Sequence, residues 1–490
     1  MGQYNDEVVL TPANVNSTNF GKVMNFPVDG RVDAQPLYLS NVNIPGVGAR
    51  NVLYVVTEHA SAYAFDANTG AQLWKTSALG SGETTSDTRG CSQVTPEIGI
   101  TATPVIDRTR GPNGALYLVA MSKSGSTYFQ RIHALDIATG AELFGGPRAI
   151  TASFPGTGAG SSNGTVNFDP KQYEERAGLL MLNGVVYTAW TSHCDNDPYT
   201  GWVMGFSATT LQQTSVINIT PNGSRGAVWM AGSGLAADGS GSIYFISGNG
   251  TFDETLDSNG FPINRNFGNG FIKLSTTSGL AVADYFSTFD TTSLSNADTD
   301  FGSGGALLVP DVVDSTGRTR HLAVGAGKDQ KIYVVDRDSM GKFSNSANNN
   351  YQTITGALGG SVFSKPAYFN GVLYYGAVGD HVKAFPLSNA RFATSPSSQT
   401  ATSFTYPGAT PSISSNGNTN GIVWAIENNG TAVLHAYDAT NLARELYNSG
   451  QAANGRDQFG AGNKFIAPVI VDSRVYVSTP NSVAAFGLLH

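Results

Sequence analysis

Residues Ala62–Thr76, with the sequence AYAFDANTGAQLWKT, combine a short apolar strand, a tight turn and a second strand. The Asp66 carboxylate is placed to accept backbone N–H groups just ahead of it and to close an Asx-type turn. Gly70 supplies a positive φ at little cost. Trp74 carries a large flat ring of the kind that is usually buried between layers. The stretch therefore predicts a strand–turn–strand unit.

The same unit recurs along the chain. Its further copies are Ile132–Phe144 (IHALDIATGAELF), Ile332–Phe343 (IYVVDRDSMGKF) and Leu434–Leu446 (LHAYDATNLAREL). One supersecondary unit that recurs at intervals of tens of residues indicates a solenoid or a propeller. No stretch shows the sustained 3.6-residue periodicity of an amphipathic helix, so we expect little helix.

A larger pattern contains these units. Each pattern opens with an apolar strand that starts at a small residue, continues with an aromatic-rich strand, and closes with a strand that often ends in Asp. We count eight such patterns, spaced by about 45–75 residues, which suits four short strands and their loops. Their opening strands start near Ala34, Ala102, Ala177, Ser233, Gly304, Ser364, Ala409 and Ile466.

The two ends of the chain complement each other. The last pattern ends at Val483–Phe486, a third strand without a fourth, whereas Phe20–Val28 is a strand candidate with no partner nearby in sequence. Pairing them would close the ring and remove its open edges. The predicted fold is all-β, a single eight-bladed β-propeller domain over residues 1–490 whose N-terminal strand closes the last blade. Four polar stretches are then expected to be loop excursions: Thr151–Asn167, Leu256–Phe267, Ser344–Thr355 and Thr394–Ser403.

Composition excludes some partners. The net charge of −8 argues against nucleic acid and against an anionic membrane surface. No apolar run approaches the roughly 20 residues that span a bilayer, so no membrane insertion is expected. Met1–Asn5 shows no secretory signal, yet the low Lys content and abundant Asn, Ser and Thr are typical of extracytoplasmic proteins. We therefore expect a periplasmic or secreted protein whose signal peptide is absent from this sequence.

Two cysteines, Cys91 and Cys194, fall on loops of the same predicted face, in neighbouring blades. In an oxidising compartment they would form one disulfide. Two unpaired thiols are the alternative, and the sequence leaves both open.

The repeat resembles that of the pyrroloquinoline quinone (PQQ) propeller family, which includes eight-bladed quinoprotein alcohol dehydrogenases and non-catalytic scaffolds of similar shape. Three stretches also resemble quinoprotein site motifs. Gly226–Trp229 (GAVW) is similar to the segment whose tryptophan stacks on the quinone. Ile243–Gly250 (IYFISGNG) is similar to the strand whose Asn binds the associated Ca²⁺. Lys328–Arg337 (KDQKIYVVDR) is similar to the stretch whose first basic residue reaches the quinone oxygens.

This resemblance implies a role for each matching residue. Trp229 would stack on PQQ, Asn249 would ligate Ca²⁺, and Lys328 would hydrogen-bond the quinone. The catalytic carboxylate of the family lies between the last two motifs, where Asp298 and Asp300 are the nearest matches.

The sequence also departs from the family. The usual Glu ligand is missing from the segment similar to Ser192–Asn196, so Asp195 would take its place as a metal ligand. The vicinal Cys-Cys pair and the c-type haem motif of many relatives are absent as well.

Two classes of function follow. The first is a quinoprotein oxidoreductase that acts on alcohols or sugars through a funnel on the top face, with PQQ and Ca²⁺ as cofactors. The alternative is a propeller without PQQ, which uses the same face as a binding or scaffold module or as a polysaccharide-active enzyme. The partner is then a small alcohol or sugar, or a polysaccharide.

Other conspicuous residues have plainer interpretations. The charge cluster Lys171–Arg176 (KQYEER) is expected to be a solvated edge, with a place in the funnel as the alternative. His133 is expected to be a packed, hydrogen-bonded histidine. Trp74 and Trp424 are expected to be structural.

Overall fold

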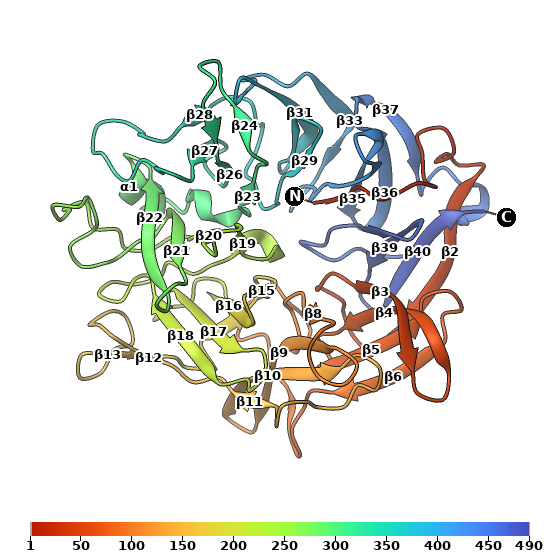
Figure 1. Cartoon of the computed structure of the whole chain (residues 1–490), viewed down its shortest axis with the longest axis horizontal. Coiled ribbons are helices and arrows are strands. Elements are labelled where there is room, and N and C mark those ends of the chain that lie inside the picture. The colour runs from red at the N-terminus through yellow and green to blue at the C-terminus, as the bar shows by residue number, and fades with distance from the viewer. Residues whose placement is uncertain (1, 490) are drawn as a thin grey trace.

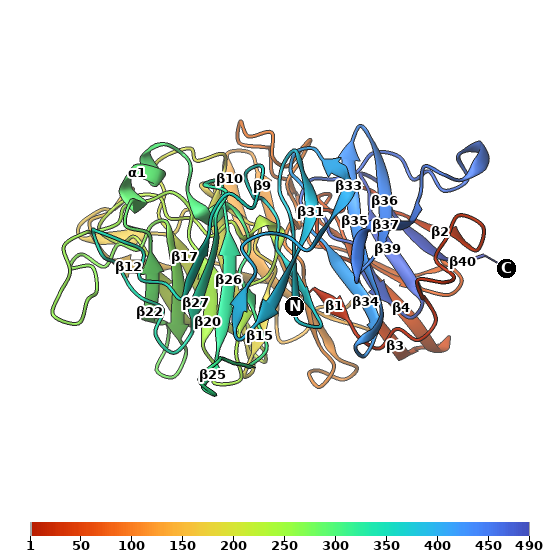
Figure 2. The same ribbon diagram turned by 90° about the horizontal axis from the view of Figure 1, so that it is seen from above.

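The computed structural model describes residues 2–489, and eight β-sheets stand in a ring within that range (Figure 1). Figure 2 shows the flattened ring from the side, with the strands running across its thickness. The eight-bladed all-β prediction is confirmed. The single-domain prediction also covered residues 1 and 490, which lie outside the described residues.

The first four blades follow one another in chain order, and in each the opening strand is followed by three more. Blade 1 contains β3 (Leu37–Ile44), β4 (Gly48–Val56), β5 (Ser61–Asp66) and β6 (Gln72–Ser77). Blade 2 contains β8 (Val105–Asp107), β9 (Ala115–Ser124), β10 (Thr127–Asp136) and β11 (Arg148–Ala149), and β7 (Thr84–Thr85) also pairs with β9. Blade 3 contains β15 (Leu180–Leu182), β16 (Val185–Ser192), β17 (Trp202–Ser207) and β18 (Gln213–Asn218), and β14 (Tyr173–Glu175) also pairs with β16. Blade 4 contains β19 (Ala236–Ala237), β20 (Ile243–Ile246), β21 (Gly270–Ser275) and β22 (Ala281–Ser287).

The last four blades repeat this order. Blade 5 contains β23 (Leu307–Leu308), β26 (Leu322–Ala326), β27 (Ile332–Asp336) and β28 (Gln352–Ile354). Blade 6 contains β29 (Ala367–Phe369), β30 (Val372–Gly376) and β31 (Asp380–Ser388), with β32 (Arg391–Phe392) and β33 (Ser398–Phe404) both paired to β31. Blade 7 contains β34 (Ser412–Asn416), β35 (Thr419–Asn429), β36 (Thr431–Asp438) and β37 (Asn441–Asn448). Blade 8 contains β38 (Val469–Val471), β39 (Arg474–Ser478), β40 (Ser482–Leu488) and β2 (Phe20–Pro27).

Blade 8 closes the ring as predicted. Strand β2 runs antiparallel to β40, from the pair Phe20 with Leu488 to the pair Pro27 with Ser482. The fully buried Phe20 ring lies 5.4 Å from the Trp424 ring of blade 7, measured between centroids. The N-terminal strand therefore completes blade 8 and also seals its seam with blade 7. A contact not predicted from the sequence adds to this: β1 (Gln3–Tyr4) pairs in parallel with β34.

The repeated turn has the chemistry expected from its sequence. Asp66 Oδ1 accepts two backbone N–H groups, at 2.9 and 3.2 Å, and Gly70 has a φ of +77°. The Trp74 indole N–H donates to the Ile137 carbonyl of blade 2 at 3.1 Å. Asp136 closes the corresponding turn in blade 2 in the same way. The turn thus shapes one blade while its tryptophan locks that blade to the next.

Two of the four predicted loop excursions are wrong. Ser344–Thr355 contains β28, and Thr394–Ser403 contains most of β33, the outer strands of blades 5 and 6. Outer strands face solvent on their free edge and need no apolar alternation, which is why the sequence resembled loop. Thr151–Asn167 includes a small hairpin of β12 (Ser153–Pro155) and β13 (Thr165–Asn167).

Helix is scarce in residues 2–489. It comprises the six-residue α1 (Thr291–Asn296) and the short 3₁₀ segments η1 (Met230–Gly232), η2 (Phe301–Ser303) and η3 (Ala453–Gly455). No helix in this range is long and apolar enough to cross a bilayer.

Candidate functional site

Loops from several blades enclose a cavity of about 300 Å³ on one face of the ring. All six residues predicted to form a site line it: Asp195, Trp229, Asn249, Asp298, Asp300 and Lys328. The other lining residues are Gln93, Arg176, Cys194, Ala231, Ser303, Phe363, Tyr406 and Phe465. The structure thus brings the predicted residues together, while their chemical roles stay predictions.

Trp229 is held by an unusual backbone. The two residues after it, Met230 and Ala231, both have a φ of +50° although neither is glycine. Such left-handed residues cost about 1–3 kcal/mol each and cluster at ligand sites. Gly248 of the next blade packs against the indole, because a Cβ there would lie only 2.9 Å from Trp229 Cδ1. The ring therefore sits on backbone and forms part of the cavity wall.

Asp300 and Lys328 are fixed to each other across two neighbouring loops. The Lys328 N–H donates to the Asp300 carbonyl at 2.8 Å, and its Nζ lies 2.9 Å from Asp300 Oδ1. The loops approach this closely because Gly327 has no side chain: a Cβ there would lie 2.1 Å from Phe301 Cα. Phe301 is fully buried and packs on Tyr333, with ring centroids 5.0 Å apart. The pair is therefore anchored in the core.

The environment shifts the pKa of both partners. Burial raises the pKa of Asp300, and the nearby Lys328 charge only partly opposes this. Burial by itself lowers the pKa of Lys328, but the Asp300 charge and the hydrogen bond to Asp298 outweigh it, so the net direction is upward. The Asp300 side chain is 2% exposed and that of Asp298 is 67% exposed. Asp300 is thus the better candidate for a proton acceptor, since a raised pKa suits a general base.

Asn249 supplies an oxygen without a partner. Its Nδ2 donates to Asp298 Oδ1 at 2.5 Å, while its own buried Oδ1 has no hydrogen-bond partner in the described part of the chain. Asp195 Oδ1 accepts from the Tyr199 hydroxyl at 2.5 Å. Residues 2–489 contain no group of three or more His, Cys, Asp or Glu side chains arranged to hold a metal. The Asn249 oxygen and the carboxylates around the cavity still match the oxygen ligands of Ca²⁺, whose other ligands would come from a bound molecule or water.

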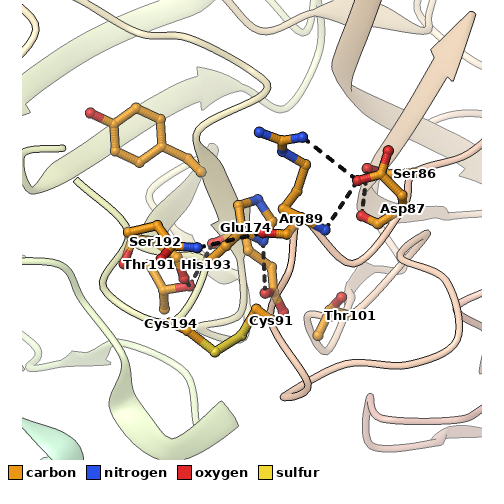
Figure 3. A network of polar contacts seen from close by, with 12 residues as sticks. Ser86, Asp87, Arg89, Cys91, Thr101, Glu174, Thr191, Ser192, His193 and Cys194 are labelled. Carbon is orange, nitrogen blue, oxygen red and sulfur yellow. Dashed lines mark hydrogen bonds and ion pairs between the residues drawn. A yellow bond between two sulfur atoms is a disulfide. The ribbon is translucent and has the colours of Figure 1, made fainter. Parts of the chain in front are cut away.

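A disulfide joins Cys91 to Cys194, with the two Cα atoms 5.4 Å apart (Figure 3). Of the two alternatives left open by the sequence, the disulfide is the one observed. It ties the loop before blade 2 to a loop of blade 3, and Cys194 lines the cavity. His193 and Glu174 are buried beside it, with 3.6 Å between His193 Nδ1 and a Glu174 carboxylate oxygen.

The expectation of a solvated edge at Lys171–Arg176 is wrong. Within it, β14 pairs antiparallel with β16, and this pairing draws Glu174, Glu175 and Arg176 into the interior. Arg176 then lines the cavity.

The plainer interpretations of the other residues are confirmed. His133 is buried and contacts Glu142 through Nδ1. Trp424 is fully buried, and its indole N–H donates to Ser414 Oγ at 2.8 Å. Trp74 is buried, and its indole N–H donates a hydrogen bond from blade 1 to the Ile137 carbonyl of blade 2.

Sequence reasoning missed three aromatic residues of the cavity, Phe363, Tyr406 and Phe465. The Tyr406 ring lies 5.4 Å from that of Phe363 and 6.2 Å from that of Phe465, so the three form a continuous wall. A weak signal was present. Phe363 directly precedes the small residue that opens blade 6, and Arg176 and Ser303 occupy the equivalent positions before blades 3 and 5.

Comparisons with known proteins identify the fold. No family profile matches the chain, and neither does any curated protein sequence. The quinohemoprotein alcohol dehydrogenase from Comamonas testosteroni is similar in structure, with a TM-score of 0.59 and 15% identity over 99% of this chain and 79% of that one. A europium-containing methanol dehydrogenase has a TM-score of 0.56 and 11% identity over 99% and 95%. BamB from Moraxella catarrhalis has a TM-score of 0.51 and 14% identity over 96% and 98%. At these identities the likeness shows a shared β-propeller fold.

Proposed function

We propose that this protein is a quinoprotein-type oxidoreductase that oxidises an alcohol or a sugar, with PQQ and Ca²⁺ held in the cavity. One observation carries the proposal. The Trp229 ring, the Asp300–Lys328 ion pair and the unpartnered Asn249 oxygen all face a single cavity. A ring-shaped ligand rich in oxygen needs a flat support, a positive charge and a ligated cation, and these residues supply one of each.

Each residue has a distinct task in this proposal. When bound, the quinone would accept a hydride and the cation would act as a Lewis acid. Trp229 would support the ring, and Lys328 would hydrogen-bond its oxygens. Asp300, buried and with a raised pKa, would take the hydroxyl proton of the substrate. Asn249 and Asp195 would hold the cation. Asp298, the other catalytic candidate, is exposed and would instead orient Asn249 through their hydrogen bond.

The proposed location is extracytoplasmic, either periplasmic or secreted. The Cys91–Cys194 disulfide supports this, because disulfides persist in oxidising compartments.

A second candidate is a propeller without PQQ that serves as a binding or scaffold module or acts on polysaccharide through the same face. The fold does not separate the two candidates, because the similar structures include BamB as well as alcohol dehydrogenases. The two candidates differ in what the cavity binds.

Adding PQQ and Ca²⁺ to the purified protein tests the proposal. We expect tryptophan fluorescence quenching and a shifted quinone absorbance, followed by dye reduction with a panel of alcohols and sugars. Trp229→Ala should abolish both signals. Lys123→Ala should change neither, since Lys123 pairs with Asp87 away from the cavity lining. A wild-type protein with no PQQ signal and no dye reduction would leave the binding module as the better function.

A further inference from the structure

A second cavity, of about 170 Å³, lies at the centre of the ring, where the innermost strands of the blades meet (Figure 1). We call it the channel cavity. Ala231 and Phe465 line both this cavity and the one of the candidate site, so the two are neighbours. None of the six predicted site residues lines the channel cavity. Its chemistry is therefore a separate question.

One position of each blade forms a ring around the channel. The position directly follows the residue that opens the blade, and its occupants are Gln35, Thr103, Gly178, Gly234, Gly305, Lys365, Thr410 and Ala467. Lys365 is the only charged member, and it lines the channel cavity. The neighbouring blade packs closely on it, because a Cβ on Gly305 would lie 3.1 Å from Lys365 Cβ. The fold thus places a single amine at the channel.

Lys365 has no partner in the protein. Within residues 2–489 its side chain forms no ion pair, hydrogen bond or cation–π contact. Every other lysine in this range has at least one such contact, for example Lys328 with Asp300 and Lys464 with the Tyr406 ring. Burial lowers the pKa of Lys365, and no neighbouring charge opposes this. The neutral amine, which is the nucleophilic form, is therefore favoured here.

Asp33 is the other ionisable residue that lines the channel cavity. In the described part of the chain its buried Oδ1 has no hydrogen-bond partner. Burial raises the pKa of Asp33 to about 6, although the charges of Arg31 and Arg176 oppose this. A carboxyl group that titrates near neutral pH can both donate and accept a proton. The channel cavity thus combines a free amine with a proton-transfer group.

We propose that Lys365 is a covalent carbonyl-binding site, which forms an imine with a small aldehyde in the channel cavity, and that Asp33 transfers the protons of this reaction. The neutral Nζ adds to the carbonyl carbon and forms a C–N bond. The nitrogen then loses its two protons, the carbonyl oxygen gains two, and the C–O bond breaks to release water. The products are an imine and one water molecule, so the step needs no oxidant or reductant.

The aldehyde has two sources. It enters from solution, or it is formed in the neighbouring cavity by oxidation of a primary alcohol. The second source rests on the proposed function, whereas the first does not.

Reductive trapping with propanal and sodium cyanoborohydride, without PQQ, tests the site. Each imine becomes a stable propylamine, and peptide mass spectrometry at short times gives the rate of modification at every lysine. The proteins are the wild type, Lys365→Arg, Asp33→Asn and Lys171→Arg. Lys171 is the matched control, because it is exposed and lies outside the lining of the channel cavity. Thermal melts check that every variant is folded.

We expect Lys365 to be modified faster than every other lysine of the folded wild type, and this preference should vanish in urea-denatured protein. Lys365→Arg should lose the fast modification, while Lys171→Arg keeps it. Asp33→Asn should slow it by at least about 10-fold, because a positioned proton donor contributes about 100-fold or more. Modification of Lys365 no faster than that of Lys171 in the folded wild type overturns the site. An unchanged rate in folded Asp33→Asn overturns the role of Asp33.

A further sample separates the two sources of aldehyde. Propan-1-ol, PQQ and Ca²⁺ replace propanal, and cyanoborohydride is added after the incubation. Modification of Lys365 in this sample assigns the aldehyde to oxidation in the neighbouring cavity. Modification by propanal alone still supports the covalent site, with aldehyde from solution, even where the oxidoreductase proposal fails.

Discussion

Lys328 Nζ lies 2.9 Å from Asp300 Oδ1, and a backbone hydrogen bond of 2.8 Å joins the same two residues. The ion pair and the backbone hydrogen bond together join the two neighbouring loops and hold Lys328 beside Asp300. The protonation of the buried Asp300 carboxyl group is therefore set by burial, which raises its pKa, and by the adjacent Lys328 charge, which partly opposes this. A base controlled in this way leaves a signature in the pH dependence of the rate.

Replacing Lys328 by Met should shift the pH–rate profile of the PQQ-loaded protein. The rate requires ionised Asp300, so it rises with pH through the pKa of this group. Loss of an opposite charge within 4 Å raises a carboxyl pKa by about 1–3 units, so the ascending limb should move up by about that amount. Lys331→Met is the control, because Lys331 pairs with Asp329 instead. An unmoved limb in Lys328→Met would show that Asp300 is not the base.

Gly248→Ala should weaken quinone binding without unfolding the protein. The added Cβ would lie 2.9 Å from Trp229 Cδ1, so the indole must shift by a few tenths of an ångström. A small displacement of a positioning group costs up to about 100-fold in function. We expect a 10- to 100-fold weaker PQQ affinity by fluorescence titration. Gly239→Ala, with open space around its Cβ, should bind as the wild type does. Unchanged affinity in Gly248→Ala would mean that the ring does not support the ligand.

Removing the disulfide should cost stability. In the chain-entropy model, a cross-link between residues 103 positions apart is worth about 4–5 kcal/mol. The Cys91→Ser/Cys194→Ser variant should lose about that free energy of unfolding in denaturant titration. Thiol titration of the unreduced, denatured wild type should detect no free thiol. Two free thiols would contradict the bond itself.

Phe20→Ala should open the seam between blades 7 and 8. The ring of Phe20 is fully buried against Trp424, Tyr447 and Phe486, and truncation of such a residue costs about 3–5 kcal/mol. The melting temperature should fall accordingly. Val23→Ala in the same strand is the control, because Val23 is 38% exposed. Similar losses in the two variants would argue against a sealing role for Phe20.

Asp33→Asn should change how stability depends on pH. Burial raises the pKa of Asp33 to about 6 from its usual 3.8, although the Arg31 and Arg176 charges oppose this. The folded protein thus binds this proton more tightly than the unfolded chain. The resulting stabilisation is full below about pH 4 and is lost as the pH rises through about 6. Asparagine carries no such proton, so the stability of the variant relative to wild type should rise across that window in urea titrations.

Asp107 is the matched control, because its pKa is shifted in the direction opposite to that of Asp33. Hydrogen bonds to Thr109 and the Arg110 charge outweigh burial and lower the pKa of Asp107. Asp107→Asn should therefore lose stability relative to wild type as the pH rises from acid. A pH-independent difference between wild type and Asp33→Asn would contradict the shifted titration of Asp33.

The propeller was predictable because its information is local. Each repeat unit, with its Asp66-type turn and its Trp74-type contact to the next blade, is encoded by a continuous segment of about 15 residues. The repetition of this segment therefore indicates the number of blades. The pairing of Phe20–Val28 with the last blade followed from counting unpaired strands. The candidate site residues Trp229, Asn249 and Lys328 were identified through the resemblance of their segments to quinoprotein motifs, and the structure places all three at one cavity.

The remaining parts of the site depend on distant loops. The sequence around Arg176 predicts a solvated segment, whereas the pairing of β14 with β16 buries this residue. No local sequence pattern indicates that pairing. Phe363, Tyr406 and Phe465 come from three separate gaps between blades, so they become a wall only when the ring has closed. The outer strands β28 and β33 were not predicted, because a strand with one edge in solvent needs no alternation of apolar and polar residues.

The pairing of β2 with β40 also has a consequence for the order of events during synthesis. Strand β2 emerges from the ribosome early, yet its partner emerges after seven blades have been made. The intervening blades can fold one after another, each on its neighbour. During this time the backbone N–H and C=O groups of β2 are unpaired, and an unpaired strand edge can associate with other chains. Ring closure is then one late event that joins the two ends of the sequence. A cut between β2 and β3 in a nascent chain would therefore remove β2 before it has paired, whereas the same cut in the folded protein would leave β2 hydrogen-bonded to β40.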